Sequence, residues 1–179
     1  MSPPDRAPPV LAAVGLGANV GAAAATLREA LHALDELPGT AVLRSSPLYR
    51  TRAWGNTQQP DFTNAAALLQ TSLDARALLD GLLGIERRFG RERGRGEQWG
   101  PRSLDLDLLL YGDQVVDEPG LQVPHRHLHE RAFALVPLLE IAGDVVIPGV
   151  GPARDALAAM AGDGSEALPY EASPPAATR

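Results

Sequence analysis

The sequence contains no cysteine and no lysine, so all 16 of the basic residues among its 179 are arginines. Without cysteine there can be no disulfide, no thiolate zinc site and no thiol nucleophile. Without lysine there can be no Walker-A lysine, no Schiff base and no strand lysine of the protein-kinase type. Any phosphate that this protein handles must therefore be bound by arginine, by backbone N–H groups or by a metal ion.

Long hydrophobic runs are also missing. No apolar stretch approaches the roughly 18 residues of a membrane span. The start, MSPPDRAPP, has neither the basic segment nor the apolar core of a signal peptide, so we expect a cytoplasmic protein with no membrane partner. A net charge of -6 argues against nucleic acid as a partner. We predict one globular domain over residues 10–162, with disordered tails at 1–9 and 163–179.

Hydrophobic periodicity indicates the class of fold. It predicts strands at 10–18, 41–49, 62–71 and from Asp105 onward, and helices at 21–37 and 74–89. It further predicts a hairpin at 112–123, a helix at 129–142 interrupted at Pro137, a strand near Val145 and a small helix at 152–161. The order β-α-β-β-α-β is that of an α+β, ferredoxin-like antiparallel sheet with its helices mainly on one face. Two long loops, 50–61 and 90–102, should border the open face, where we expect a ligand.

The segment LDLD raises a physical question, because it places two acids in an apolar strand. Residues two apart share a strand face, so Asp105 and Asp107 should stand about 6 to 7 Å apart. Leu104, Leu106, Leu108 and Leu110 should line one face, and Leu109 and Tyr111 should join the acids on the other. Like charges this close repel unless a cation or water separates them. A solvated strand face and a Mg2+ site both satisfy that condition.

The loop that leads into this strand concentrates positive charge. Arg91, Arg93, Arg95 and Arg102 lie among four glycines, and planar guanidinium groups match phosphate oxygens. A solvated charged loop would explain the arginines alone. Because the arginines run directly into the Asp pair, the combination favours metal-bound polyphosphate.

Two further groups of residues complete the candidate site. In VPHRHLHERAF, His125 and Arg131 are candidate phosphate donors, whereas His127 and His129 are expected at the surface. Phe62 and Asn64 should share one face of their strand, and other aromatic residues lie near the loops. Aromatic rings beside an amide would form a slot for a flat heterocycle.

Three motifs, QPDFTNAA, IERRFGRERGRGEQWGPRSLDLDLLLYG and VPHRHLHERAF, resemble in this order the signatures of the 6-hydroxymethyl-7,8-dihydropterin pyrophosphokinase family. The resemblance covers residues 10–151. It implies a magnesium-dependent transfer of pyrophosphate from ATP to the pterin hydroxymethyl group, which releases AMP, in tetrahydrofolate biosynthesis. We expect a monomer that can associate with neighbouring folate-pathway enzymes, although the sequence leaves the oligomeric state open.

The resemblance assigns roles to particular residues. Asp105 and Asp107 would bind two Mg2+ ions, and the catalytic set would be Arg91, Arg102, Asp105 and Asp107. The ATP-binding set would be Glu86, Arg91, Arg93, Trp99, Arg102, His125 and Arg131. The pterin-binding set would be Thr51, Trp54, Gly55, Phe62, Asn64 and Phe133. Ala53 departs from the proline common in the family, and an extra loop residue leaves the register of the loop arginines open.

Two other functions would use some of the same residues. A ferredoxin-like RNA-binding module would use the arginine loop and the aromatic residues, but its Asp pair would repel the RNA backbone. A metal-dependent nucleotide hydrolase would use the Asp pair and the loop, but it leaves the aromatic residues and Asn64 without a role. The sequence does not identify a general base.

Overall fold

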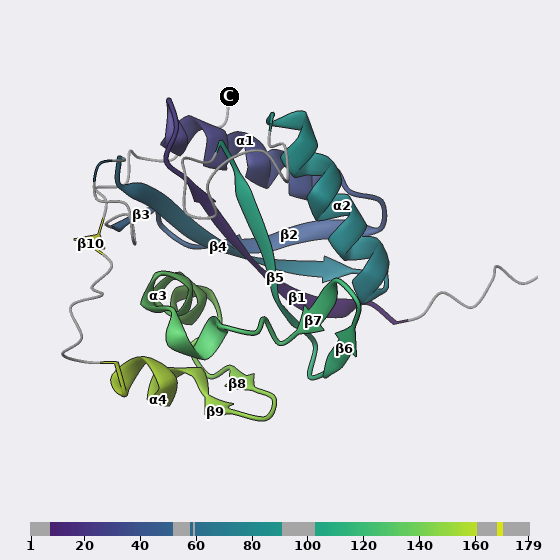
Figure 1. Cartoon of the computed structure of the whole chain (residues 1–179). Helices are drawn as coiled ribbons and strands as arrows, with labels where there is room; N and C mark the ends of the chain where they lie inside the picture. The colour runs from purple at the N-terminus through teal and green to yellow at the C-terminus, as the bar shows by residue number, and fades with distance from the viewer. Residues whose placement is uncertain (1–7, 52–57, 59, 91–102, 161–167, 170–179) are drawn as a thin grey trace, which may run out of the picture.

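An antiparallel β-sheet forms the centre of the computed structural model, which describes residues 8–51, 58, 60–90, 103–160 and 168–169 (Figure 1). Its strands are β1 (Val10–Ala18), β2 (Thr40–Ser45), β3 (Tyr49–Thr51), β4 (Phe62–Thr71), β5 (Asp105–Tyr111) and β10 (Leu168–Pro169). The order is β10-β3-β4-β1-β5, and β2 also pairs with β4. Strand β1 is therefore an interior strand, with β4 on one side and the edge strand β5 on the other.

Helices cover both faces of this sheet. Helices α1 (Ala23–Asp35) and α2 (Ala75–Arg88) form the main core with residues of β1 such as Val14. Helices α3 (Ala132–Ile141) and α4 (Ala153–Ala158) form a second core with Ala13 on the opposite face (Figure 1). The prediction of helices on mainly one face thus holds for α1 and α2 alone. Apolar residues on the second face need cover too, and α3 supplies it.

Short elements connect these layers. The predicted hairpin is confirmed as β6 (Val116–Glu118) with β7 (Leu121–Val123), and β8 (Val146–Ile147) pairs with β9 (Gly151–Pro152). A 3-10 turn, Leu128–Glu130, precedes α3. No helix within the described ranges has the length and apolarity to cross a bilayer.

The single strand predicted at 41–49 is two strands, β2 and β3. Ser45 pairs with Ala67 and Tyr49 pairs with Asn64. The segment 45–49 therefore has one more residue between these pairs than the facing segment of β4. The Ser46 N–H donates to the Ala66 carbonyl at 2.9 Å, and the Ser46 hydroxyl accepts from the Ala66 N–H at 2.9 Å. Pro47 has no N–H with which to continue the ladder, so the strand is interrupted there.

A β-bulge changes which residues of β5 face the main core. Val14 pairs with Leu108 and Ala13 with Leu110, which leaves Leu109 as the extra residue. The predicted alternation is therefore wrong for the two residues after the bulge. Leu110 joins the α3/α4 core and Tyr111 joins the α1/α2 core. The acids precede the bulge and keep the predicted alternation.

Pro137 lies inside α3, and the predicted interruption of the helix there is wrong. The helix begins at Ala132 rather than at His129. Proline has a φ angle close to that of a helix, and its missing N–H removes one helical hydrogen bond. Leu135 and Leu138, on either side of the proline, are both 0% exposed, and this burial stabilises the helix across it.

Candidate functional site

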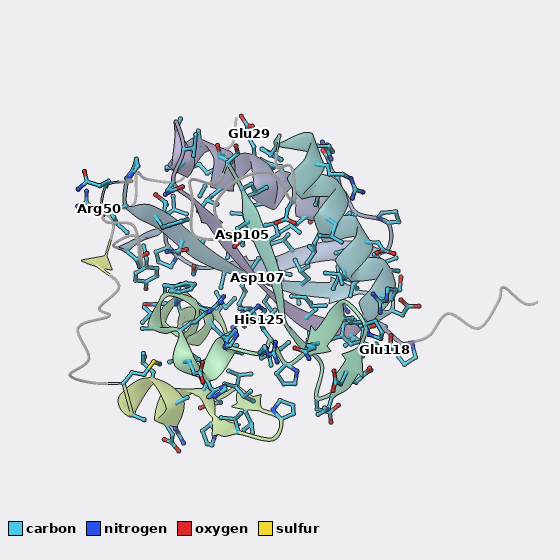
Figure 2. The ribbon with its side chains drawn as sticks, viewed as in Figure 1. Glu29, Arg50, Asp105, Asp107, Glu118 and His125 are labelled. Carbon is cyan, nitrogen blue, oxygen red and sulfur yellow. The ribbon has the colours of Figure 1, made fainter. Side chains whose placement is uncertain are left out.

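The two acids lie side by side on the face of β5 that points away from the main core. Asp105 and Asp107 are half-buried, whereas Leu104 and Leu106 are fully or almost fully buried. Figure 2 labels both acids along β5 and His125 nearby. The strand reading of LDLD is therefore confirmed: the leucines anchor the strand and the carboxylates remain accessible.

Two glycines on the neighbouring strand face the acids. In the pairing of β1 with β5, Gly17 lies opposite Asp105 and Gly15 lies opposite Asp107. Both glycines lie inside the strand predicted at 10–18, and neither was among the predicted site residues. Their alternate spacing in GLG was the available signal, because it places both on one strand face. Strand β1 therefore places no side chain directly opposite either carboxylate.

Gly17 also pairs with Asn64 on β4, and this creates a row across the sheet. The row runs from Asn64 through Gly17 to Asp105, with an amide at one end and a carboxylate at the other. Strands are spaced about 4.8 Å apart, so the two ends of the row are about 9.6 Å apart. Gly17, which has no side chain, thus separates an amide from an acid.

The amide of Asn64 is held in place. Its Nδ2 donates to Thr51 Oγ1 at 2.7 Å, and the residue is only 6% exposed. A Cβ atom added at Gly17 would lie 2.9 Å from Asn64 Oδ1, which is closer than real Cβ atoms come. Phe62, half-buried, pairs with Thr51 across β3 and β4. Three of the predicted pterin residues, Thr51, Phe62 and Asn64, are therefore neighbours on one sheet face.

Two nitrogen-bearing side chains among the described residues lie near Asp107. His125 Nε2 lies 3.8 Å from Asp107 Oδ1, and Arg131 Nη1 lies 3.9 Å from Asp107 Oδ2. Burial, followed by the positive charges of Arg131 and His127, lowers the pKa of His125 to about 4, although Asp105 acts in the opposite direction. His125 is therefore neutral at pH 7, whereas Arg131 brings a positive charge to Asp107.

Local structure explains how these two residues reach β5. The His125 N–H donates to the Leu109 carbonyl at 2.9 Å, which joins the segment after β7 to the bulge of β5. Arg131 is the N-cap residue of α3, and its guanidinium lies 5.5 Å from the centre of the Phe133 ring. The first turn of α3 thus brings a cation to Asp107 and an aromatic ring beside it.

The remaining predicted residues divide into three groups. Glu86 is 1% exposed in α2, and its Oε2 accepts from the Leu106 N–H, between the two acids, at 3.1 Å. The side chains of His127 and His129 are 46% and 40% exposed, so their predicted surface position is confirmed. Several predicted residues lie outside the described residues: Trp54, Gly55, Arg91, Arg93, Arg95, Trp99 and Arg102.

The donor atoms suit a hard cation. Two carboxylates on one face offer oxygen ligands, which Mg2+ prefers to softer donors. Within the part of the chain that the structure describes, no cluster of three or more His, Asp or Glu side chains could hold a metal. Mg2+ commonly binds through one or two carboxylates and completes its shell with substrate phosphates and water, so the pair fits that ion.

An antiparallel α+β domain that carries an Asp pair and a hydrogen-bonded amide on one sheet face has the features of a phosphate-transferring enzyme. The family described as 7,8-dihydro-6-hydroxymethylpterin-pyrophosphokinase (HPPK) matches residues 13–143. The chain belongs to this family, and the resemblance inferred from the three motifs is confirmed.

Relatives in two bacteria cover most of this chain. A 2-amino-4-hydroxy-6-hydroxymethyldihydropteridine pyrophosphokinase of Pseudomonas aeruginosa is 43% identical over 156 residues, which is 87% of this chain and 95% of the relative. A protein of the same name from Methylorubrum extorquens is 46% identical over 153 residues, 86% of this chain and 95% of the relative.

Solved structures share the fold. Plasmodium falciparum HPPK-DHPS with pterin and p-hydroxybenzoate has a TM-score of 0.67 and 14% identity, over 88% of this chain and 42% of that one. An HPPK-DHPS in complex with substrates has a TM-score of 0.64 and 13% identity, over 86% of this chain and 43% of that one. The chain therefore spans less than half the length of these proteins.

Proposed function

We propose that this chain transfers pyrophosphate from ATP to the hydroxymethyl group of 6-hydroxymethyl-7,8-dihydropterin, giving the pterin diphosphate and AMP in tetrahydrofolate biosynthesis. Membership of the family supports this reaction, as do the names of relatives that are more than 40% identical. The single observation that carries it in the structure is the row Asn64–Gly17–Asp105.

The row matches the two ends of the proposed substrate. A flat pterin over Gly17 would be read along its polar edge by the Asn64 amide, while its alcohol would extend toward the Asp pair. We propose that Gly17 is required because a Cβ atom there would lie 2.9 Å from Asn64 Oδ1 and displace the amide that contacts the ring. Phe62 and Phe133 are the proposed stacking rings, and Thr51, Trp54 and Gly55 are the other proposed pterin contacts.

We propose two Mg2+ ions with Asp105 and Asp107 as their protein ligands. Ions bound there would neutralise the phosphate chain and stabilise the attacking and leaving oxygens. Arg131, 3.9 Å from Asp107, would hold phosphate oxygens next to the acids, and neutral His125 could donate one hydrogen bond to them. For ATP we further propose Glu86, Arg91, Arg93, Trp99 and Arg102.

The mechanism that follows is an in-line displacement at the β-phosphorus. The chain has no cysteine and no lysine to act as a covalent nucleophile. Its residues would therefore act by orienting the alcohol and by balancing charge at the phosphates. Arg91 and Arg102 are the proposed catalytic arginines of this step.

Two finer points extend the proposal. The sheet order β5-β1-β4-β2, with every neighbour antiparallel, supports a ferredoxin-like plan with added loops. The structural neighbours are HPPK-DHPS proteins, which supports a functional association with another folate-pathway enzyme. We propose that this chain itself is a monomer.

One assay tests the reaction. The chain is incubated with MgATP, with and without the pterin alcohol, and the nucleotide product is identified by chromatography. AMP that forms only with pterin is the expected result. ADP would show a simple kinase, and AMP or ADP formed without pterin would show a nucleotide hydrolase. No consumption of ATP would contradict an enzymatic function of this kind.

A further inference from the structure

A hydrogen bond joins two elements that carry opposite parts of the proposed pterin slot. Tyr49 on β3 donates from its hydroxyl to Glu140 Oε1 on α3 at 2.6 Å, across 91 residues of sequence. Tyr49 is only 7% exposed, whereas Glu140 is exposed. Burial, together with the bond to Glu140 and its charge, raises the pKa of Tyr49 to about 12, which agrees with a phenol that donates to a carboxylate.

Each partner of this bond shares its element with a predicted pterin residue. Tyr49 and Thr51 are two apart on β3, so their side chains point to the same face. Glu140 follows Phe133 by seven positions, or about two helical turns, so the two lie along one side of α3. The bond therefore connects the strand that carries Thr51 to the side of the helix that carries Phe133.

Apolar packing alone does not determine where α3 lies along the sheet. Leu135 and Leu138 bury the helix against the second face, but hydrophobic contact is non-directional. A hydrogen bond to a carboxylate is directional and stronger than a neutral one. We propose that the Tyr49–Glu140 hydrogen bond positions α3, and with it Phe133, relative to Thr51 and Asn64, so that Tyr49 and Glu140 are positioning residues for pterin binding.

This inference rests on the proposed function and adds a specific prediction to it. Loss of the bond should let α3 shift relative to β3 and widen the space between Phe133 and the sheet. Binding of the pterin should then weaken, whereas binding of ATP near Asp105 and Asp107 should not.

The test is the substitution Tyr49→Phe, which removes the hydroxyl and keeps the ring. We expect the Kd and KM for the pterin to rise about tenfold, the scale of one charge-assisted hydrogen bond. The KM for ATP should stay within twofold of wild type, and kcat should change less than the pterin KM. Glu140→Ala should reproduce this pattern, and the double substitution should be no worse than either single one.

Two further substitutions separate positioning from general stability. Glu140→Gln keeps an acceptor oxygen, so it should restore most of the pterin affinity. Tyr111→Phe is the matched control, since Tyr111 is 5% exposed and its hydroxyl donates to the Leu73 carbonyl on the other side of the sheet. It should lower the melting temperature and leave the pterin Kd unchanged.

Each alternative result has a defined meaning. If the wild-type chain does not bind the pterin or makes no AMP, the proposed function fails and this inference fails with it. If the wild type is active and Tyr49→Phe binds the pterin normally, this inference alone is wrong. It is also wrong if Tyr49→Phe weakens ATP and pterin binding equally, or if Tyr111→Phe weakens pterin binding as much.

Discussion

Replacement of Gly17 by alanine tests the proposed slot with a single methyl group. The added Cβ would lie 2.9 Å from Asn64 Oδ1, below the separations that real Cβ atoms show. Gly17 and Asn64 are direct partners in the ladder, so the strand pairing fixes their backbone spacing. The amide must therefore turn or move, and movement competes with its 2.7 Å hydrogen bond to Thr51.

The size of the effect follows from these contacts. Overpacking in a well-packed region costs about 1 to 3 kcal/mol, and loss of one hydrogen bond by a buried amide falls in the same range. We therefore expect the free energy of unfolding to fall by about 1 to 3 kcal/mol. Pterin affinity should fall about 10- to 100-fold, since one or two hydrogen bonds to the ring are lost and each 1.4 kcal/mol is tenfold.

The assay is calorimetric titration of the pterin in the presence of a non-hydrolysable ATP analogue, together with urea unfolding. Gly15→Ala is the matched control on the same strand and face, because its Cβ would meet Leu109 at 3.5 Å, an ordinary contact. Its pterin affinity should stay within threefold of wild type. Wild-type pterin affinity in Gly17→Ala would refute the reasoning that Asn64 is a constrained pterin contact.

Three other measurements test the acids, a tyrosine and a helix cap. In Asp107→Asn we expect turnover to fall at least about 10³-fold, because metal stabilisation of several kcal/mol is lost. The free energy of unfolding should change by less than about 1 kcal/mol, since the pair with Arg131 is partly exposed. Near-normal turnover at saturating Mg2+ would contradict the predicted loss of activity. The pKa of Tyr49 is raised to about 12 in the folded chain. The stabilisation of the folded state by the protonated Tyr49 is therefore complete below pH 10 and is lost as the pH rises toward 12. Stability should therefore fall over that range, and more steeply in wild type than in Tyr49→Phe, with no lysine titrating at the same pH. The Asp74 side chain is the N-cap of α2 and accepts from the Ala77 N–H at 2.7 Å. Asp74→Ala should therefore lower the free energy of unfolding, measured in urea, by about 1 kcal/mol. An unchanged urea midpoint would show that the cap has no energetic effect.

The parts of the site that local periodicity determines could be predicted from the sequence. Asp105 and Asp107 share a face because strand alternation holds up to the bulge. Leu110 and Tyr111 could not be placed, because the bulge arises from pairing with β1 and has no local signal in a leucine run. Helix α3 continues through Pro137 for a similar reason, since tertiary burial outweighs the intrinsic preference of proline.

Contacts between distant segments lay beyond what sequence patterns can determine. Arg131 was identified as a candidate phosphate donor from its motif, but its approach to Asp107 depends on where α3 packs on the sheet. The Tyr49–Glu140 bond depends on the same packing. The family resemblance supplied roles for single residues, and the structure adds which of the described residues are neighbours.

The opposite faces of β1 explain how the sheet can accommodate two glycines. Glycine inside a strand is destabilising by roughly 0.5 to 1 kcal/mol relative to alanine. On the other face of the same strand, Ala12 and Val14 are 0% exposed and Leu16 is 2% exposed, within the main core. Strands on both sides and an apolar face within the main core hold β1 in place, so the strand does not depend on side chains at positions 15 and 17. The same strand can therefore be firmly held in the sheet and form the floor of the proposed slot, and its pairing with β4 and β5 sets the separation between the Asn64 amide and the acids.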